Sequence, residues 1–161
     1  MAETLVKLPD YWFSHHLLEV QQAREIADLR RVALQILNRM PRPIVQVCGP
    51  LSTGGVGTLD GNLRRFERAI IVLKYRQFNV FDQMSFQPAM KRIADAAGGN
   101  GYYWPIIDHF YEPIFRSGLI SETFFLPDWE NSTGTARERQ IVNECGIPVT
   151  AFLEEWLFGP P

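Results

Sequence analysis

Apolar positions recur with two different periods along the chain, and the change from one period to the other predicts the order of the elements. Residues 14–40 show apolar side chains every three or four positions, which predicts one amphipathic helix that Pro41 and Pro43 end. This helix either covers one face of a sheet or meets a second subunit. The apolar positions are Leu18, Ile26, Leu29, Ala33, Ile36, Leu37 and Met40.

Short apolar runs alternate with helical segments in the rest of the chain. Strands are predicted at residues 44–48, 78–81, 119–126 and 147–152, and helices at 62–75, 84–97, 104–116 and 133–145. A strand, helix and strand in succession form a right-handed crossover, which makes the two strands parallel. The pattern therefore predicts an α/β fold. We expect an open three-layer sandwich, similar to flavodoxin or the Rossmann fold, with a mostly parallel sheet of four or five strands and an extra N-terminal helix.

Length and composition indicate one domain over residues 1–161, with residues 1–42 as a helical extension. The chain has 161 residues, of which 46% are hydrophobic, and this is enough for one buried core. A formal net charge of −2 argues against a nucleic-acid polymer as partner. No apolar run reaches the roughly 20 residues of a membrane helix, and no secretory leader is evident, so we expect no membrane partner and a cytoplasmic location.

The cysteines and histidines do not have the spacing of a metal site. Cys48 and Cys145 are far in sequence from each other and from His15, His16 and His109. We expect two reduced thiols and no metal.

Polar residues at the join between a strand and a helix make residues 126–138 the most informative stretch. Asn131 or Ser132 is a natural N-cap, and Glu138 follows about one and a half turns into the helix. The glycine-rich loop 49–61 also follows a strand. Since parallel strands end at the same edge of a sheet, both segments are expected at one crevice. This edge is a candidate site for a small polar ligand.

Three segments together resemble the nucleoside 2-deoxyribosyltransferase superfamily, which includes deoxynucleotide N-glycosidases. The likeness covers residues 43–153 and is closest to small bacterial and phage members of unassigned function. The first segment runs from Leu126-Pro127-x-Trp129 through Ser132-x-Gly134-x-x-x-Glu138 to Gly146-Ile147-Pro148-Val149. The second is Val45-Gln46-Val47-Cys48-Gly49-Pro50 with Ser52-Thr53-Gly54-Gly55, and the third is Trp104-Pro105-Ile106-Ile107-Asp108-His109-Phe110-Tyr111.

The resemblance implies a chemistry at the N-glycosidic bond of a nucleoside or nucleotide, without a cofactor. Glu138 would attack the anomeric carbon, and Asp108 would act as acid/base or orient the base. Trp129 is the best candidate to stack on that base. The sugar and its 5′ group would be held by Gly49, Pro50, Ser52, Thr53, Gly54, Gly55, Ser132 and Gly134. The resemblance also implies a homo-oligomer.

Plainer interpretations of the same residues remain open. Glu138 can be a solvated helix residue paired with Arg137 or Arg139, Ser132 can be only a cap, and Asp108 can be hydrogen-bonded to Tyr111. The aromatic residues can belong to the core.

The chain departs from the family at two positions. Gln46 stands where the family has a tyrosine that orients the glutamate, and Ser121 or Glu122 stands at the place of an aspartate. These departures favour a second hypothesis, a non-catalytic nucleotide-binding or interaction module on the same fold.

Overall fold

The protein is an α/β structure with one parallel sheet of four strands. The computed structural model describes residues 7–51 and 54–158. The strands are β1 (Ile44–Cys48), β2 (Asn79–Val80), β3 (Glu122–Phe125) and β4 (Val149–Ala151), in the order β2-β1-β3-β4. All neighbouring strands are parallel, with Val45 opposite Val80 and Glu122, and Thr123 opposite Val149. The expected fold class is confirmed.

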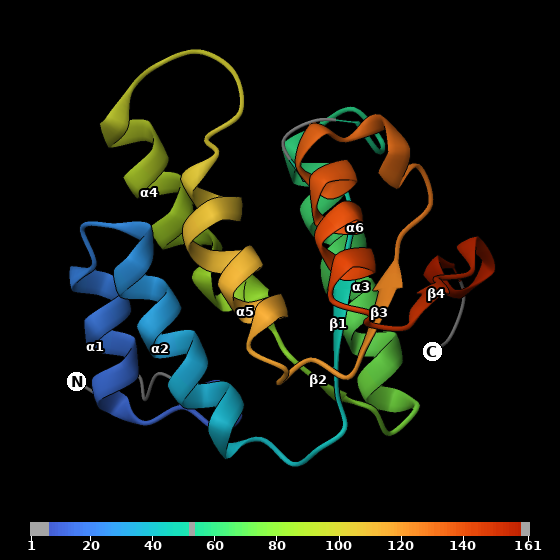
Figure 1. The fold of residues 1–161 in the computed structure, drawn as a ribbon, viewed down its shortest axis with the longest axis horizontal. Coiled ribbons are helices and arrows are strands. Elements are labelled where there is room, and N and C mark those ends of the chain that lie inside the picture. The colour runs from blue at the N-terminus through green and yellow to red at the C-terminus, as the bar shows by residue number, and fades with distance from the viewer. Residues whose placement is uncertain (1–6, 52–53, 159–161) are drawn as a thin grey trace, which may run out of the picture.

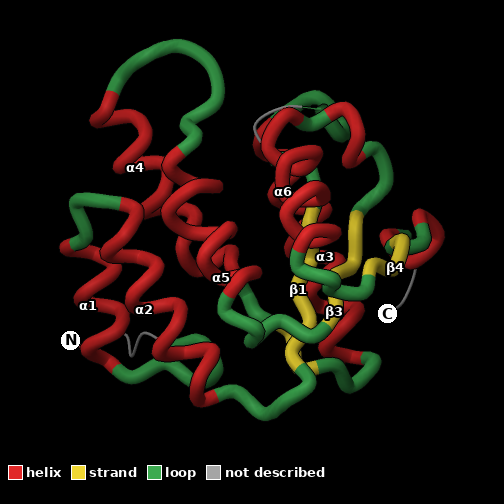
Figure 2. Tube along the Cα trace, in the orientation of Figure 1, coloured by secondary structure: helices red, strands yellow, loops and turns green. Residues whose placement is uncertain are grey.

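The helices form layers on both faces of this sheet. They are α1 (Ser14–Gln22), α2 (Ile26–Arg39), α3 (Leu59–Tyr75), α4 (Gln87–Ala97), α5 (Glu112–Arg116) and α6 (Thr133–Glu144). Short helical turns occur at η1 (Gln83–Phe86), η2 (Ile107–Tyr111), η3 (Trp129–Asn131) and η4 (Glu154–Leu157). Figure 1 shows α5 between the strands and α2. Figure 2 shows a long loop after α4, which leads back toward the sheet through η2.

Side-chain alternation along β1 divides the core into two clusters. Val45 and Val47 face α3 and pack in one cluster with Phe66, Leu73 and Phe124. The other face belongs to a larger cluster, to which η2, α5 and α6 contribute. That cluster includes Ile44, Cys48, Phe110, Ile114, Ile141 and Val142. The sheet therefore lies between α3 on one side and η2, α5 and α6 on the other.

The N-terminal region differs from the single helix expected over residues 14–40. The helix is broken at residues 23–25, because the Asp28 carboxylate accepts hydrogen bonds from the backbone N–H groups of Arg24 and Glu25, at 3.0 and 3.1 Å. Asp28 thus starts α2 as a new helix. The buried face of α2 packs against η2, α4 and α5, outside the helices that contact the sheet.

The helix expected at 104–116 also changes character. Its middle is the π-helical turn η2, in which Glu112 N–H bonds to the carbonyl of Ile107. Pro113 follows and has no N–H to continue an α-helical ladder. The wider turn brings Ile107, Phe110 and Tyr111 into the interior, whereas Asp108 and His109 are exposed.

Candidate functional site

A cavity of about 620 Å³ lies at the carboxyl edge of the sheet, where the crevice was expected. Its walls come from the ends of three strands, from α3, α4, η2 and α6, and from the loop after α4. Strand-end residues at the cavity are Gly49 and Leu51 after β1, Met84 after β2, and Ser132 and Gly134 after β3. Leu59, Leu63, Pro88, Met90, Ala94 and Ile106 make the side walls largely apolar.

Glu138 lines this cavity from the second turn of α6. The Ser132 hydroxyl accepts a hydrogen bond from Thr135 N–H at 3.4 Å, so the helix starts at Thr133. Gly134, Glu138 and Ile141 then follow at helical spacing on the buried face of α6. Only 8% of Glu138 is exposed to solvent. The structure thus brings Glu138, Ser132, Gly134 and Gly49 to one cavity.

Burial is the main influence on the charge of Glu138. Desolvation raises its pKa from 4.5 to about 8, and a hydrogen bond from the Cys48 thiol acts in the opposite direction with smaller effect. Among the described residues, no ion pair joins Glu138 to a lysine, arginine or histidine. The carboxyl is therefore mostly protonated at pH 7.

Two tyrosines face Glu138 across the cavity. Burial raises the pKa of Tyr102 and Tyr111 well above the ordinary range, and the nearby Glu138 carboxylate adds to the effect on both. The Tyr111 hydroxyl hydrogen-bonds the side-chain amide of Gln87. The Tyr102 ring packs directly on Gly134, since a Cβ at that position would lie 2.5 Å from the Tyr102 hydroxyl. Both phenols are neutral hydroxyl groups beside the carboxyl.

The glycine-rich loop shapes the cavity more than it lines it. Gly49 borders the cavity, whereas Pro50, Gly54 and Gly55 do not. Gly54 has a φ of +69°, and a Cβ there would lie 2.7 Å from the Asn131 carbonyl oxygen. A bulkier residue therefore has no room where the loop meets the turn before α6. The expected contacts of Ser52 and Thr53 fall outside the described residues.

Asn62 at the start of α3 holds this loop in place. Its side-chain amide donates to the carbonyls of Leu51 and Gly54, at 2.7 and 3.2 Å, and its oxygen accepts from Val56 N–H at 3.0 Å. Asn62 is 1% exposed. One buried amide thus links both ends of the loop to α3.

Gln46 does not reach the cavity wall. It is fully buried in β1, on the side of the sheet that Ile44 and Cys48 face. Neither its amide nitrogen nor its amide oxygen has a hydrogen-bond partner among residues 7–51 and 54–158. Gln46 therefore makes no side-chain hydrogen bond within the described residues that would orient Glu138.

Asp108 and Trp129 do not line the cavity that Glu138 lines, although Asp108 is near enough to Tyr102 to help raise the pKa of that phenol. Asp108 is exposed on η2, because the π-helical turn directs its neighbours Ile107 and Phe110 inward. Trp129 packs edge-on against Phe125, with a centroid distance of 5.7 Å, and the Arg139 guanidinium covers it. Neither residue borders the cavity, so the roles expected for them at a bound base are not supported by their placement.

Sequence reasoning missed Tyr102 as a residue of the site, and it indicated Tyr111 only as one of several aromatic residues. Tyr102 follows the glycine-rich segment at residues 98–101, whose path over α6 depends on tertiary packing. For Tyr111 a signal was present, because it lies at helical spacing from the inward-facing Ile107. Cys48, at the end of β1, was indicated only as a reduced thiol.

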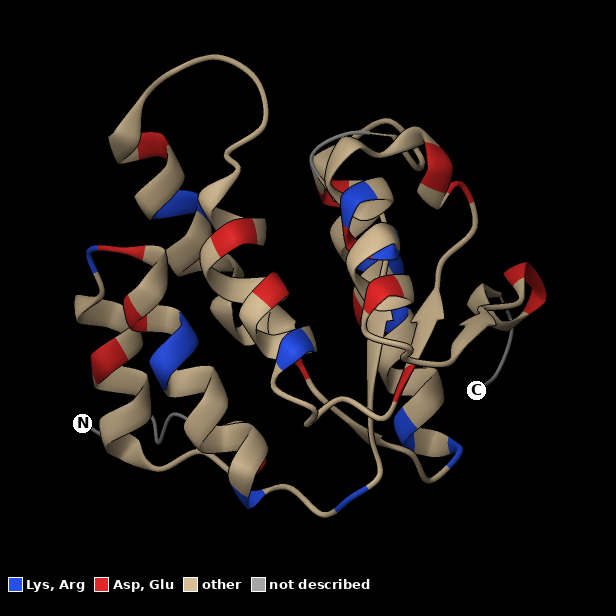
Figure 3. Ribbon diagram, viewed as in Figure 1, with Lys and Arg blue, Asp and Glu red and all other residues tan. Residues whose placement is uncertain are grey.

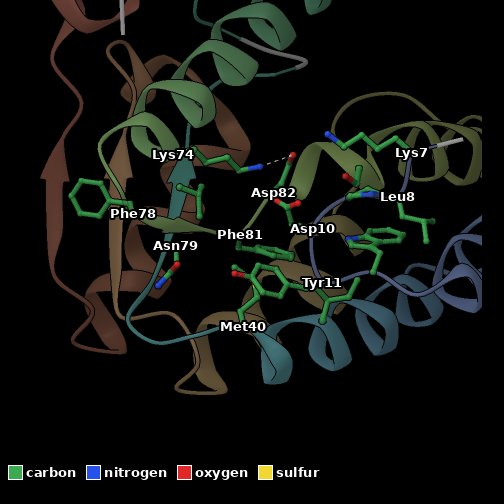
Figure 4. Close-up of a pocket in the computed structure, with 15 residues that line it drawn as sticks. Lys7, Leu8, Asp10, Tyr11, Met40, Lys74, Phe78, Asn79, Phe81 and Asp82 are labelled. Carbon is green, nitrogen blue, oxygen red and sulfur yellow. Dashed lines mark ion pairs between the residues drawn. The ribbon is translucent and has the colours of Figure 1, made fainter.

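A second cavity of about 530 Å³ lies beside β2, at the edge of the sheet (Figure 4). The N-terminal residues Asp10, Tyr11 and Trp12 form one wall. An ion pair of 3.7 Å joins Lys74 and Asp82 at the other. Among the described residues that line this cavity, none is a sequence-predicted site residue.

Comparisons with known proteins leave the chain without an assigned relative. No family model matches it, and neither the curated proteins nor the solved structures contain a match. Within the described ranges, no three histidine, cysteine or acidic residues lie close enough together to bind a metal ion. No helix in this part of the chain has the length and apolar character needed to cross a membrane. Both cysteines are free thiols.

Proposed function

We propose that the protein cleaves or transfers at the N-glycosidic bond of a nucleoside or nucleotide, with Glu138 as the nucleophile. The observation that supports this most is the position of the Glu138 carboxyl. It lies buried on the wall of a cavity at the strand ends, beside the turn at Ser132 and the end of β1 at Gly49. A cavity of about 620 Å³ is within the usual size range of small-ligand sites.

The reaction needs a carboxylate below a carbon that develops positive charge. A Glu138 oxygen bonds to the anomeric carbon, the bond from that carbon to the base nitrogen breaks, and the base leaves with the electron pair. Water, or a second base, then attacks the glycosyl ester and frees Glu138. The neutral hydroxyl groups of Tyr102 and Tyr111 are hydrogen-bond donors for the sugar or for the carboxylate.

The protonation of Glu138 limits the rate at neutral pH. With a pKa of about 8, roughly a tenth of the carboxyl is ionised at pH 7. We expect kcat/KM to rise with pH up to about 8 and then level off, since the free enzyme must bind substrate with the carboxyl ionised. An activity that falls over this range would identify Glu138 as an acid instead.

Base release from a panel of nucleosides and 5′-nucleotides, followed by chromatography, tests this function. Glu138→Gln keeps the shape of the side chain but removes the nucleophile, and we expect a loss of about 10³-fold or more. Glu144→Gln is the matched control on the same helix, because Glu144 is exposed and pairs with Arg116. Absence of release from every compound, or equal rates for wild type and Glu138→Gln, would rule the proposal out.

A binding-only function at the same cavity is the alternative, and the protonated state of Glu138 favours it. A carboxyl that is mostly neutral at pH 7 is a hydrogen-bond donor rather than a nucleophile. The same panel separates the two functions: calorimetric binding of an intact nucleoside, without base release up to pH 9, would support binding alone.

A further inference from the structure

We infer that the cavity prefers a ligand whose aromatic ring carries a formal positive charge, and that the substrate is an N-glycoside of such a cationic base. This inference deepens the proposed function and rests on it for the cleavage step. The preference for a cationic ring, however, follows from the cavity itself and can be measured without any reaction.

Acidic residues outnumber basic residues around the cavity. Glu67, Asp95 and Glu138 line it, and Lys91 is the one basic residue that does so within the described part of the chain. Lys91 is exposed and forms an ion pair of 2.7 Å with Asp95. Its charge is therefore balanced at the rim. An anionic ligand would meet Glu67 without a free cation to compensate, whereas a cation is attracted by Glu67 and favours the ionised form of Glu138.

Aromatic rings surround the same space. Tyr102, Tyr103 and Tyr111 all line the cavity, from the loop after α4 and from η2. Trp104 contacts Tyr102 edge-on at a centroid distance of 5.0 Å, and Gly134 lies against the Tyr102 hydroxyl. Tyrosine faces attract cations, most strongly where the cation is shielded from water. A planar cation with apolar edges fits both these rings and the apolar side walls.

A bound cation would also change the state of Glu138. The groups that face this carboxyl are Cys48 from β1, Tyr102 from the loop and Tyr111 from η2, all of them neutral when protonated. None of the three supplies the positive charge that would stabilise a buried carboxylate. The guanidinium of Arg139, whose charge reaches the Cys48 thiol, lies over the rings of Phe125 and Trp129. A cationic ring in the cavity supplies that positive charge, and so favours the ionised form that the nucleophile requires.

The chemistry of the leaving group is an independent reason to expect a cationic base. A neutral base must gain a proton as its bond to the sugar breaks, but Asp108, the expected donor, lies outside the cavity. A cationic base needs no proton, because the electron pair of the broken bond neutralises its charge. Glu138 forms the bond to the anomeric carbon, and water later replaces Glu138 and releases one proton to solvent. The sum is glycoside cation plus water to sugar, neutral base and a proton.

Calorimetry with two small rings of the same shape tests the charge preference. 1-Methylnicotinamide is cationic, and 3-methylbenzamide is its neutral carbon isostere. We expect the full-length protein at pH 8 to bind the cation at least about tenfold more tightly. Glu138→Gln should reduce this ratio, since it removes one of the two carboxyl groups that attract the cation, while Glu144→Gln leaves it unchanged. Equal affinities in the wild-type protein, tighter binding of the neutral ring, or no binding of either at millimolar concentration would overturn the inference.

Chromatography with nicotinamide riboside and with neutral nucleosides separates this inference from the proposed function. One outcome is that the two rings bind equally and that base is released from neutral nucleosides only, in a reaction that depends on Glu138. This outcome would overturn the cation preference but would leave the proposed glycosidase function standing. Tighter binding of the cationic ring without release of any base would overturn the glycosidase but keep the cation preference. The wild-type comparison of the two rings needs no variant, so a failure of Glu138→Gln to fold does not affect it.

Discussion

At the residue scale, the environment of one carboxyl has the largest consequences for this protein. Glu138 lies in a cavity with Cys48, Tyr102 and Tyr111 around it, and burial moves its pKa to about 8. When this carboxyl is protonated at low pH, it stabilises the folded protein relative to the unfolded chain. It becomes a nucleophile only at higher pH, where it is ionised. The same physical cause therefore links folding to the proposed chemistry.

Glu138 makes the protein less stable as the pH rises. Its pKa is about 8 in the folded protein and 4.5 in the unfolded chain, so the folded state binds the proton more tightly. The contribution of this proton to the free energy of unfolding is complete below pH 4.5 and is lost between pH 4.5 and 8. It amounts to a few kcal/mol. We expect the wild-type Tm to fall relative to that of Glu138→Gln over this range. Parallel Tm curves for the two proteins would contradict this, and Glu144→Gln serves as the control.

Gly134 is the position where an added methyl group should disturb the site most. A Cβ would lie 2.5–2.8 Å from three atoms of Tyr102, so Gly134→Ala must displace that ring. We expect a cost of roughly 1–3 kcal/mol in the free energy of unfolding, although alanine normally stabilises a helix. A double-mutant cycle with Tyr102→Ala checks the cause, because the cost should disappear when the ring is absent. The same cost in both backgrounds would exclude a clash with Tyr102.

At the element scale, single side chains determine where loops and helices begin. Asp28 separates α1 from α2, Ser132 starts α6, and Arg92 of α4 donates to the carbonyls of Ala23 and Val20 at the end of α1. Asn62 does the same for the loop after β1, through three hydrogen bonds. These residues place the elements that surround the cavity.

Asn62→Ala should loosen the loop that borders the cavity. Val56 N–H and the carbonyls of Leu51 and Gly54 would lose their partner, which we expect to cost about 2–4 kcal/mol in chemical denaturation. Hydrogen exchange at the Val56 amide should speed up in the same variant. The control is Asn143→Ala, an exposed asparagine on α6. Unchanged exchange at Val56 would show that Asn62 does not hold the loop.

At the scale of the whole molecule, the two clusters of the core share one sheet. α2 contributes Leu29, Ala33 and Leu37 to the same cluster as η2 and α5, and none of these three is exposed. Lysine and arginine are interspersed with acidic residues over the helices, so neither charge gathers on one element in this view (Figure 3). Burial of apolar side chains, rather than charge, connects the N-terminal helices to the rest.

Because both clusters of the core pack on the same sheet, we expect the chain to unfold as one unit. Leu37→Ala removes a fully buried side chain from α2 and should cost about 2–5 kcal/mol. Far-UV circular dichroism and tryptophan fluorescence, which reports on Trp12 and on Trp156 across the sheet, should shift to the same new midpoint. Leu18→Ala, at an exposed position on α1, is the control. Two separate transitions would mean that α1 and α2 unfold independently.

Much of the fold could be predicted from local pattern. β1 has the expected limits, α6 starts at the cap indicated by Ser132, and the sheet is parallel as the alternation of strands and helices predicts. The break at Asp28 and the π-helical turn at η2 could not be predicted, because each depends on one side-chain contact or one missing N–H within an otherwise regular periodicity.

The candidate site divides in the same way. The order of elements alone determined that Gly49, Ser132 and Glu138 lie at one edge, since parallel strands must end together. Only the tertiary structure decided which side chains enter the cavity there: Tyr102 and Tyr111 do so, whereas Asp108 and Trp129 do not. Periodicity specifies a helix face to within a turn, but the direction of a loop and the rotation of a helix follow from how neighbouring elements pack. The protonation state of Glu138 likewise follows from its burial by several elements, and this burial cannot be predicted from any single position in the sequence.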